Sequence, residues 1–181
     1  YAAPWWLPGG NLQTIYASLL ASAGDLRYRR ERWTTPDGDF VDVDLNYGAD
    51  EARSPLVVLF HGLEGGSRSH YALAFMRALA RRGWRGAVAH FRGCSGELNR
   101  LPRAYHSGDS AEIDWMLRRF RPEAGGAPLY AVGVSLGGNA LLKWLGEQGA
   151  QAPVRCAAAV SVPFLLHDSA QRLNRGVSRI Y

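Results

Sequence analysis

The sequence contains one lysine, two cysteines and no apolar run of eighteen residues. Without such a run it predicts no membrane-spanning helix. Two cysteines, Cys94 and Cys156, are too few for the disulfide framework of a small secreted protein, so we expect reduced thiols and a cytoplasmic location. The sequence also lacks Cys-x-x-Cys and His-x-x-x-His spacings, and it therefore predicts no metal site.

Positive charge is carried almost entirely by arginine, and the formal net charge is +5. The paired arginines lie in separate segments, at 29–30, 81–82 and 118–119, and no basic arm with interleaved aromatic residues is present. This dispersal argues against a nucleic-acid partner. We therefore interpret the arginine excess as a compositional bias of the genome rather than as an attraction to anionic lipid or nucleic acid.

The 181 residues are enough for one globular domain with a sizeable core. The sequence starts at Tyr1 rather than at Met, which predicts that the natural N-terminus is missing, and no signal peptide is visible. Residues 1–24 contain adjacent tryptophans, Trp5 and Trp6, followed by a short apolar stretch. We expect this segment to pack onto the rest of the domain, with a role for the tryptophans in lining a pocket as the alternative.

From residue 30 onward, strand patterns alternate with helix patterns. A starting hairpin is predicted from strands at 30–35 and 40–45, joined by the turn signal Pro-Asp-Gly at 36–38. In the second strand Asp42 and Asp44 alternate with apolar residues, which predicts a half-buried strand. Further strands are expected at 56–60, 87–89, 129–134 and 156–162, and helices at 71–79, 109–120 and 136–145. This order predicts an α/β fold with a mostly parallel sheet and an antiparallel edge.

The most specific catalytic signal is the pentapeptide Gly133-Val134-Ser135-Leu136-Gly137. It follows a predicted buried strand and opens a predicted helix, the context of a nucleophile elbow. The serine of such an elbow stands on a strained, crowded turn, so the residues two before and two after it need to lack side chains. Ser135 is therefore the candidate nucleophile.

A second signal, His61-Gly62-Leu63-Glu64-Gly65-Gly66, directly follows the strand predicted at 56–60. Acyl transfer builds an oxyanion that needs two backbone N–H donors, one after the nucleophile and one in a loop of this type. Leu136 and Leu63 are the candidates for these donors. We interpret His61 as a residue that fixes the loop rather than as the catalytic base, and Glu64 as a partner of the loop backbone rather than as an acid–base group.

Two further loops are predicted at the same end of the sheet. The glycine-rich run at 92–96 contains Cys94, which we do not favour as a second nucleophile because no base is placed for it. The run at 105–109 leads into a helix, with Ser107 or Asp109 as its N-cap and His106 as a loop hydrogen-bonding residue.

These motifs together resemble the YheT-like hydrolases, a branch of the α/β-hydrolases that includes bacterial esterases and eukaryotic lipases. The resemblance implies Ser135 as nucleophile and the amides of Leu63 and Leu136 as oxyanion donors. It also implies a small-molecule or lipid-like carboxylic ester as substrate, with no cofactor. The matching stretches are 11–14, 61–65, 69–71, 91–97, 99–109 and 133–139.

The family order places an acidic residue and then a histidine after the nucleophile. After Ser135 the sequence has one histidine, His167, and the adjacent Asp168 comes in the wrong order to orient it. The resemblance therefore places both triad partners beyond Tyr181, together with the last two strands of the usual eight. We expect an incomplete single domain, with its core at 25–162 and the start of a lid region at 163–181.

Three functions are compatible with these motifs. Ester hydrolysis through an acyl-enzyme on Ser135 is the first, and acyl transfer to another acceptor on the same scaffold is the second. A non-catalytic binding module is the third, because a fold does not fix a function. The truncated chain is expected to be nearly inactive, and its last strand, at a bare sheet edge, invites self-association.

Overall fold

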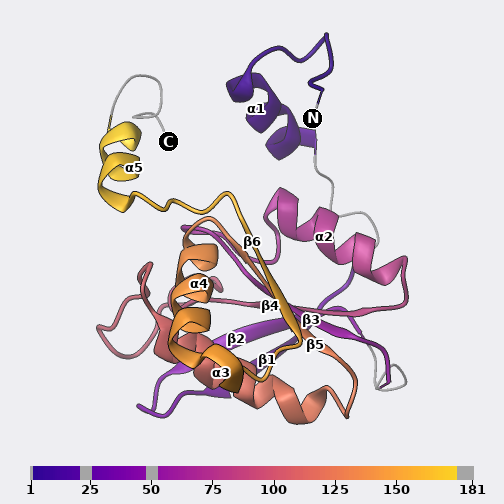
Figure 1. Cartoon of the computed structure of the whole chain (residues 1–181), viewed down its shortest axis with the longest axis vertical. Coiled ribbons are helices and arrows are strands. Elements are labelled where there is room, and N and C mark those ends of the chain that lie inside the picture. Colours follow the sequence, from indigo (N-terminus) through magenta and orange to yellow (C-terminus); the bar gives the residue numbers. More distant parts are fainter. Residues whose placement is uncertain (1, 21–25, 48–52, 175–181) are drawn as a thin grey trace.

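The computed structural model describes residues 2–20, 26–47 and 53–174 (Figure 1). Its centre is a six-stranded sheet with the order β1-β2-β4-β3-β5-β6. β1 and β2 form an antiparallel hairpin, β2 pairs antiparallel with β4, and the other pairs are parallel. The strands are β1 (Arg29–Thr34), β2 (Phe40–Leu45), β3 (Leu56–Phe60), β4 (Arg85–Ala89), β5 (Leu129–Val134) and β6 (Cys156–Val160). The predicted mostly parallel sheet with an N-terminal antiparallel hairpin is therefore confirmed.

Helices cover both faces of the sheet. Two of them lie side by side on one face, where they bury the larger apolar cluster, and a third packs against β4 on the other face (Figure 1). They are α3 (Ser110–Glu123) and α4 (Leu136–Gln148) on the first face, and α2 (His70–Ala80) on the second. A short 3₁₀ turn, Gly149–Gln151, follows α4. The three core helices agree with the helices predicted at 109–120, 136–145 and 71–79.

The prediction of a half-buried second strand is wrong, because every residue of β2 is buried. Asp42 and Asp44 are accommodated since each carboxylate receives a bidentate pair of hydrogen bonds from an arginine on β1. Arg32 donates to Asp42 at 2.8 and 2.9 Å, and Arg30 donates to Asp44 at 2.7 Å twice. Burial of a carboxylate is tolerated when it is paired and hydrogen-bonded in this way.

The N-terminal helix α1 (Gly10–Leu20) stands clear of the sheet at the top of Figure 1. Trp5 is 91 % exposed, and the packing expected for this residue is not seen against the described residues. Trp6 is 50 % exposed and sets its ring edge-on against Tyr16 of α1, with ring centroids 5.1 Å apart. The linker at 21–25 lies outside the described residues, as does Tyr1.

The sheet ends at β6, which pairs with β5 and is largely exposed. β6 stops at Val160 rather than at residue 162. The chain then leads through the exposed Phe164 and Leu165 into a short helix, α5 (Leu166–Leu173), which lies away from the sheet in the region predicted to begin a lid (Figure 1). Of that region, residues 175–181 lie outside the described part of the chain.

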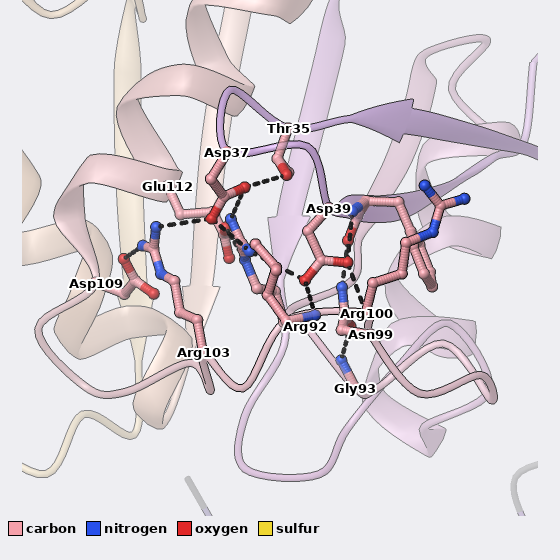
Figure 2. A network of polar contacts seen from close by, with 12 residues as sticks. Thr35, Asp37, Asp39, Arg92, Gly93, Asn99, Arg100, Arg103, Asp109 and Glu112 are labelled. Atoms are coloured by element: carbon pink, nitrogen blue, oxygen red, sulfur yellow. Dashed lines mark hydrogen bonds and ion pairs between the residues drawn. The ribbon is translucent and has the colours of Figure 1, made fainter.

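A buried network of charges ties the hairpin turn to the loop after β4 (Figure 2). Its centre is Arg92, whose side chain is 2 % exposed. The guanidinium contacts Glu112 at 2.7 Å, Asp37 at 2.9 Å and Asp39 at 3.3 Å. Arg92 therefore joins three segments that are far apart in the sequence.

Asp39, the third acidic partner of Arg92, also binds backbone amides. It accepts hydrogen bonds from the amides of Phe40, Arg100 and Leu101 at 2.9 to 3.2 Å (Figure 2). Burial alone would raise the pKa of Asp39, but these hydrogen bonds and one from Asn99 lower the pKa to about 2. The carboxylate is therefore charged at neutral pH, and it depends on Arg92 for a counter-charge.

Replacing Arg92 with methionine keeps much of the side-chain volume and removes the charge. Because buried carboxylates are left without their partner, we expect the free energy of unfolding to fall by about 3 kcal/mol or more. Urea denaturation measures the change. The matched control is Arg118→Met, which removes an arginine that is 50 % exposed and paired with Asp114, and should lower the free energy of unfolding far less than Arg92→Met does. Equal losses in the two variants would contradict a structural role for the buried network.

Candidate active site

Ser135 is the single residue between the end of β5 at Val134 and the start of α4 at Leu136, where the chain turns sharply. Its backbone has φ +53° and ψ −117°, a conformation that is costly for a residue with a side chain. The Ser135 amide donates to the carbonyl of Val160 at 2.8 Å, and its carbonyl accepts from the amide of Asn139 at 3.0 Å. The residue is half-buried, so its hydroxyl is not sealed inside the core.

The glycines around Ser135 are required by close backbone contacts. A Cβ placed on Gly133 would lie 2.6 Å from the carbonyl oxygen of Gly137, and one on Gly137 would lie 2.6 Å from the carbonyl oxygen of Phe60. The clashing atoms belong to the backbone, so they cannot move aside as the end of a flexible side chain could. The elbow is thus pressed against the end of β3, as the crowded turn predicted from the sequence requires.

The His-Gly loop after β3 lies directly beside the serine. A Cβ on Gly62 would lie 3.2 Å from Cβ of Ser135 and 3.8 Å from its Oγ. Gly62 precedes Leu63, and Leu136 follows Ser135, so the two candidate oxyanion amides flank this contact. Within the described residues, neither amide donates a hydrogen bond to a protein acceptor.

His61 is buried, and both of its ring nitrogens contact backbone groups, one in its own loop and one in the loop after β4. Its Nδ1 lies 2.7 Å from the carbonyl oxygen of Gly62, and its Nε2 accepts from the amide of Phe91 at 3.0 Å. Burial lowers the pKa of His61 to about 4, so the ring is neutral at physiological pH. These contacts fit the loop-fixing role expected for His61, and they tie the loop after β3 to the loop after β4.

The other loop residues singled out in the sequence are also placed. Glu64 has φ +50°, and its amide donates to the hydroxyl of Tyr105, in the loop between β4 and α3, at 2.8 Å. The hydrogen bond expected between Glu64 and the backbone of its own loop is not seen among the described residues. Burial raises the pKa of Cys94, which does not favour a thiolate nucleophile. His106 accepts from the amide of Gly108 at 3.1 Å, as expected of a loop residue, and Asp109 takes the N-cap position of α3.

No histidine in the described part of the chain is hydrogen-bonded to the hydroxyl of Ser135. His90 is engaged by Asp44, 2.9 Å from its Nε2, and by the carbonyl of Cys94, 3.2 Å from its Nδ1. His167 lies on α5 and is bonded to Gln171 at 2.8 Å. The structure therefore brings the loop that carries Leu63 against Ser135, and no histidine of the described residues is bonded to the hydroxyl of Ser135.

A cavity of about 990 Å³ adjoins the second half of the His-Gly loop. Its walls include Asp44, Ser67 and His90, and Ser135 is not among its lining residues. Burial would raise the pKa of Asp44, but hydrogen bonds from Arg30, His90 and Ser67 outweigh burial and hold the pKa well below its ordinary value. Sequence reasoning missed this buried cluster, because its members come from β2 and from the loops after β3 and β4.

The described residues contain no group of three or more His, Cys, Asp or Glu side chains that could hold a metal ion. None of the helices in this part of the chain has the length and apolar character that a bilayer crossing requires.

Gly137→Ala tests the crowding at the elbow. The added methyl group would overlap the carbonyl oxygens of Phe60 and His61, so we expect a loss of about 2 kcal/mol or more in the free energy of unfolding. Gly146→Ala is the matched control on the same helix, where a Cβ meets open space. It should stabilise the protein by roughly 0.5–1 kcal/mol, because alanine is the better helix former. Thermal and urea denaturation of both variants would refute the crowding if Gly137→Ala were the neutral one.

Comparisons with known proteins agree with this geometry. The model of the alpha/beta hydrolase fold family matches residues 55–177. A protein named "Putative esterase YheT" from Escherichia coli is 44 % identical over 172 residues, which are 94 % of this chain and 51 % of the relative. Mouse phospholipase ABHD3 is 30 % identical over 97 % of this chain and 44 % of its own length. The chain thus spans about half the length of these curated relatives.

Among solved structures, the Pyrococcus furiosus esterase Pf2001 superposes with a TM-score of 0.63 at 19 % identity, covering 84 % of this chain and 58 % of that one. A serine hydrolase without a lid from Xanthomonas campestris gives 0.60 at 17 % identity, covering 76 % and 62 %. At these identities the likeness concerns the fold. Together with the family match and the identity to YheT, it establishes that the chain belongs to the α/β-hydrolase family and is a homologue of YheT, as its motifs predicted.

Proposed function

We propose that this chain carries the nucleophile and oxyanion-binding half of a serine esterase. The hydroxyl oxygen of Ser135 attacks the carbonyl carbon of a carboxylic ester, and the alcohol leaves to give an acyl-enzyme. Water then attacks the acyl group, which regenerates the serine and releases the acid. The observation that carries the proposal is the position of Ser135, on a strained turn with its side chain against the backbone of Gly62.

The amides of Leu63 and Leu136 are the proposed oxyanion donors. They come from the two loops that meet at this contact, and both lack a protein acceptor among the described residues. Donors that are already oriented before the reaction stabilise the negative charge of the tetrahedral intermediate. The start of α4 lies directly behind Ser135, and a helix N-terminus favours negative charge at this place.

The general base and the acid that orients it are proposed to lie beyond Tyr181. The five histidines of the sequence are at 61, 70, 90, 106 and 167, and none is hydrogen-bonded to Ser135 in the described residues. His61 is held neutral with both nitrogens engaged, which makes it unsuitable for accepting the serine proton.

The proposed substrate is a small-molecule or lipid-like ester. Relatives of this chain are named as an esterase, a phospholipase and, in yeast, a monoacylglycerol lipase that is 32 % identical over 83 % of this chain and 32 % of its own length. Ester cleavage is shared by all three names. A cytoplasmic location and self-association through the edge of β6 are part of the same proposal.

Replacing Ser135 with alanine in the full-length gene product tests the nucleophile. Because the attacking oxygen is removed, hydrolysis of p-nitrophenyl esters should fall by roughly 10³-fold or more. A fluorophosphonate should add one label to the unmodified protein, mapped to Ser135 by mass spectrometry. The control is Thr34→Ala, which removes an exposed hydroxyl from β1 and should change neither result. Labelling at another residue, or retained turnover in the alanine variant, would end the proposal.

The isolated 181-residue chain is expected to be nearly inactive on the same esters, because nothing within it deprotonates Ser135. The measurement compares its turnover with that of the full-length gene product, using circular dichroism to establish that the chain is folded. Full turnover from the isolated chain that disappears in Ser135→Ala would place the base inside residues 1–181.

A further inference from the structure

Two tyrosine hydroxyls accept hydrogen bonds from the His-Gly loop, one on each side of Leu63. The hydroxyl of Tyr71 accepts a hydrogen bond from the amide of Gly62 at 3.0 Å, and the hydroxyl of Tyr105 accepts one from the amide of Glu64 at 2.8 Å. The amide of Leu63 lies between these two in the sequence and has no protein acceptor in the described residues. Of three successive N–H groups, the outer two are thus engaged by phenols and the middle one is left to bind something else.

Tyr71 reaches the loop from the first turn of α2. Its oxygen fills the space beside Gly65, where an added Cβ would lie 2.5 Å from the hydroxyl. The loop is closed by a second contact at the same place, because the amide of Gly65 donates to the carbonyl of Gly62 at 3.0 Å. Tyr71 therefore fixes the orientation of the peptide unit that joins His61 to Gly62. The next peptide unit carries the Leu63 amide.

Tyr105 reaches the loop from the opposite direction. It comes from the long loop between β4 and α3, and its ring stacks on Phe91 with centroids 5.2 Å apart and planes 6° from parallel. The amide of Phe91 in turn donates to His61, so Phe91 and the Tyr105 stacked on it bind the His-Gly run at His61 and at Glu64. Burial raises the pKa of Tyr105 to about 12, and the neutral hydroxyl is available to accept from Glu64.

We propose that Tyr71 and Tyr105 are positioning residues that aim the Leu63 amide at the developing oxyanion. This inference rests on the function proposed above and extends it to residues that do not touch the substrate. Pinning the peptides on both sides of Leu63 fixes the direction of its N–H before substrate arrives. Such preorganisation matters because the donor must meet the oxyanion position, and a loop free to rotate would have to be ordered during the reaction.

The test is Tyr71→Phe and Tyr105→Phe in the full-length gene product, each of which removes one oxygen and keeps the ring. We expect kcat for a p-nitrophenyl ester to fall roughly three- to tenfold in each variant, the size of one lost neutral hydrogen bond, with little change in KM. A trifluoromethyl ketone, which adds to the serine and places an oxyanion in the same site, should bind weaker by the same factor as kcat/KM falls. A purely structural role for the hydroxyls would not produce this parallel.

The matched control is Tyr47→Phe. Its hydroxyl also makes a hydrogen bond, to Glu123 at 3.2 Å, but next to the end of β2 and away from the loop. Rates are expressed per serine titrated with fluorophosphonate, so that an unfolded fraction does not count as a lower kcat. If kcat per titrated site and ketone affinity in both loop variants stay within the change seen for Tyr47→Phe, the inference is wrong.

The two levels of the proposal fail differently. If fluorophosphonate does not label Ser135, or Ser135→Ala keeps its activity, the proposed function itself fails. If Ser135 passes both tests and the tyrosine variants behave like the control, the positioning role alone is overturned.

Discussion

The site depends on one close approach of backbone to backbone, between the end of β3 and the turn after β5. Parallel pairing sets Phe60 opposite Gly133, so the two strands end at the same level and their following loops must share the same space. The start of α4 fits there because Gly137 has no side chain to strike the carbonyl of Phe60. At this contact Ser135 has a strained backbone conformation, with φ +53°.

Around this contact, polar side chains hold loops that a glycine-rich sequence would otherwise leave loose. His61, Tyr71 and Tyr105 bind backbone groups of the loops after β3 and β4. Further out, Arg92 and Asp39 bind the hairpin turn to the loop after β4 and to α3 (Figure 2). The antiparallel hairpin is therefore more than an edge of the sheet, because it supplies the charges that anchor a loop leading to Tyr105.

The strand-to-helix turn at Ser135 could be predicted from the sequence because its requirements are local. Gly133, Ser135 and Gly137 lie within five residues, and the strand before them and the helix after them follow from apolar periodicity. Burial of Asp42 and Asp44 could not be predicted in this way. Their alternation with apolar residues has the period of a half-exposed strand, and the arginines that allow burial are defined by cross-strand register rather than by sequence neighbours.

The tyrosines were missed for a related reason. Tyr105 is 41 residues from the amide that it binds, and nothing in the run at 105–109 indicates that its hydroxyl reaches back to Glu64. Tyr71 fits the apolar pattern of the helix predicted at 71–79, and that pattern does not indicate that its hydroxyl accepts a hydrogen bond from Gly62. A signal was present in Gly65, because a glycine that makes room for a hydroxyl differs from one that supplies a turn, but the sequence alone does not distinguish the two.

In the proposed mechanism, the orientation of the oxyanion donors and the activation of the nucleophile depend on different residues. The contacts that hold Ser135 and the amides of Leu63 and Leu136 run through β3, β4, β5 and their loops, and all of these lie within the described residues. The removal of the serine proton needs a group that these contacts do not include. If Ser135 is the nucleophile, as proposed, a base supplied by other residues would change the protonation of its hydroxyl without having to rebuild the turn that holds it.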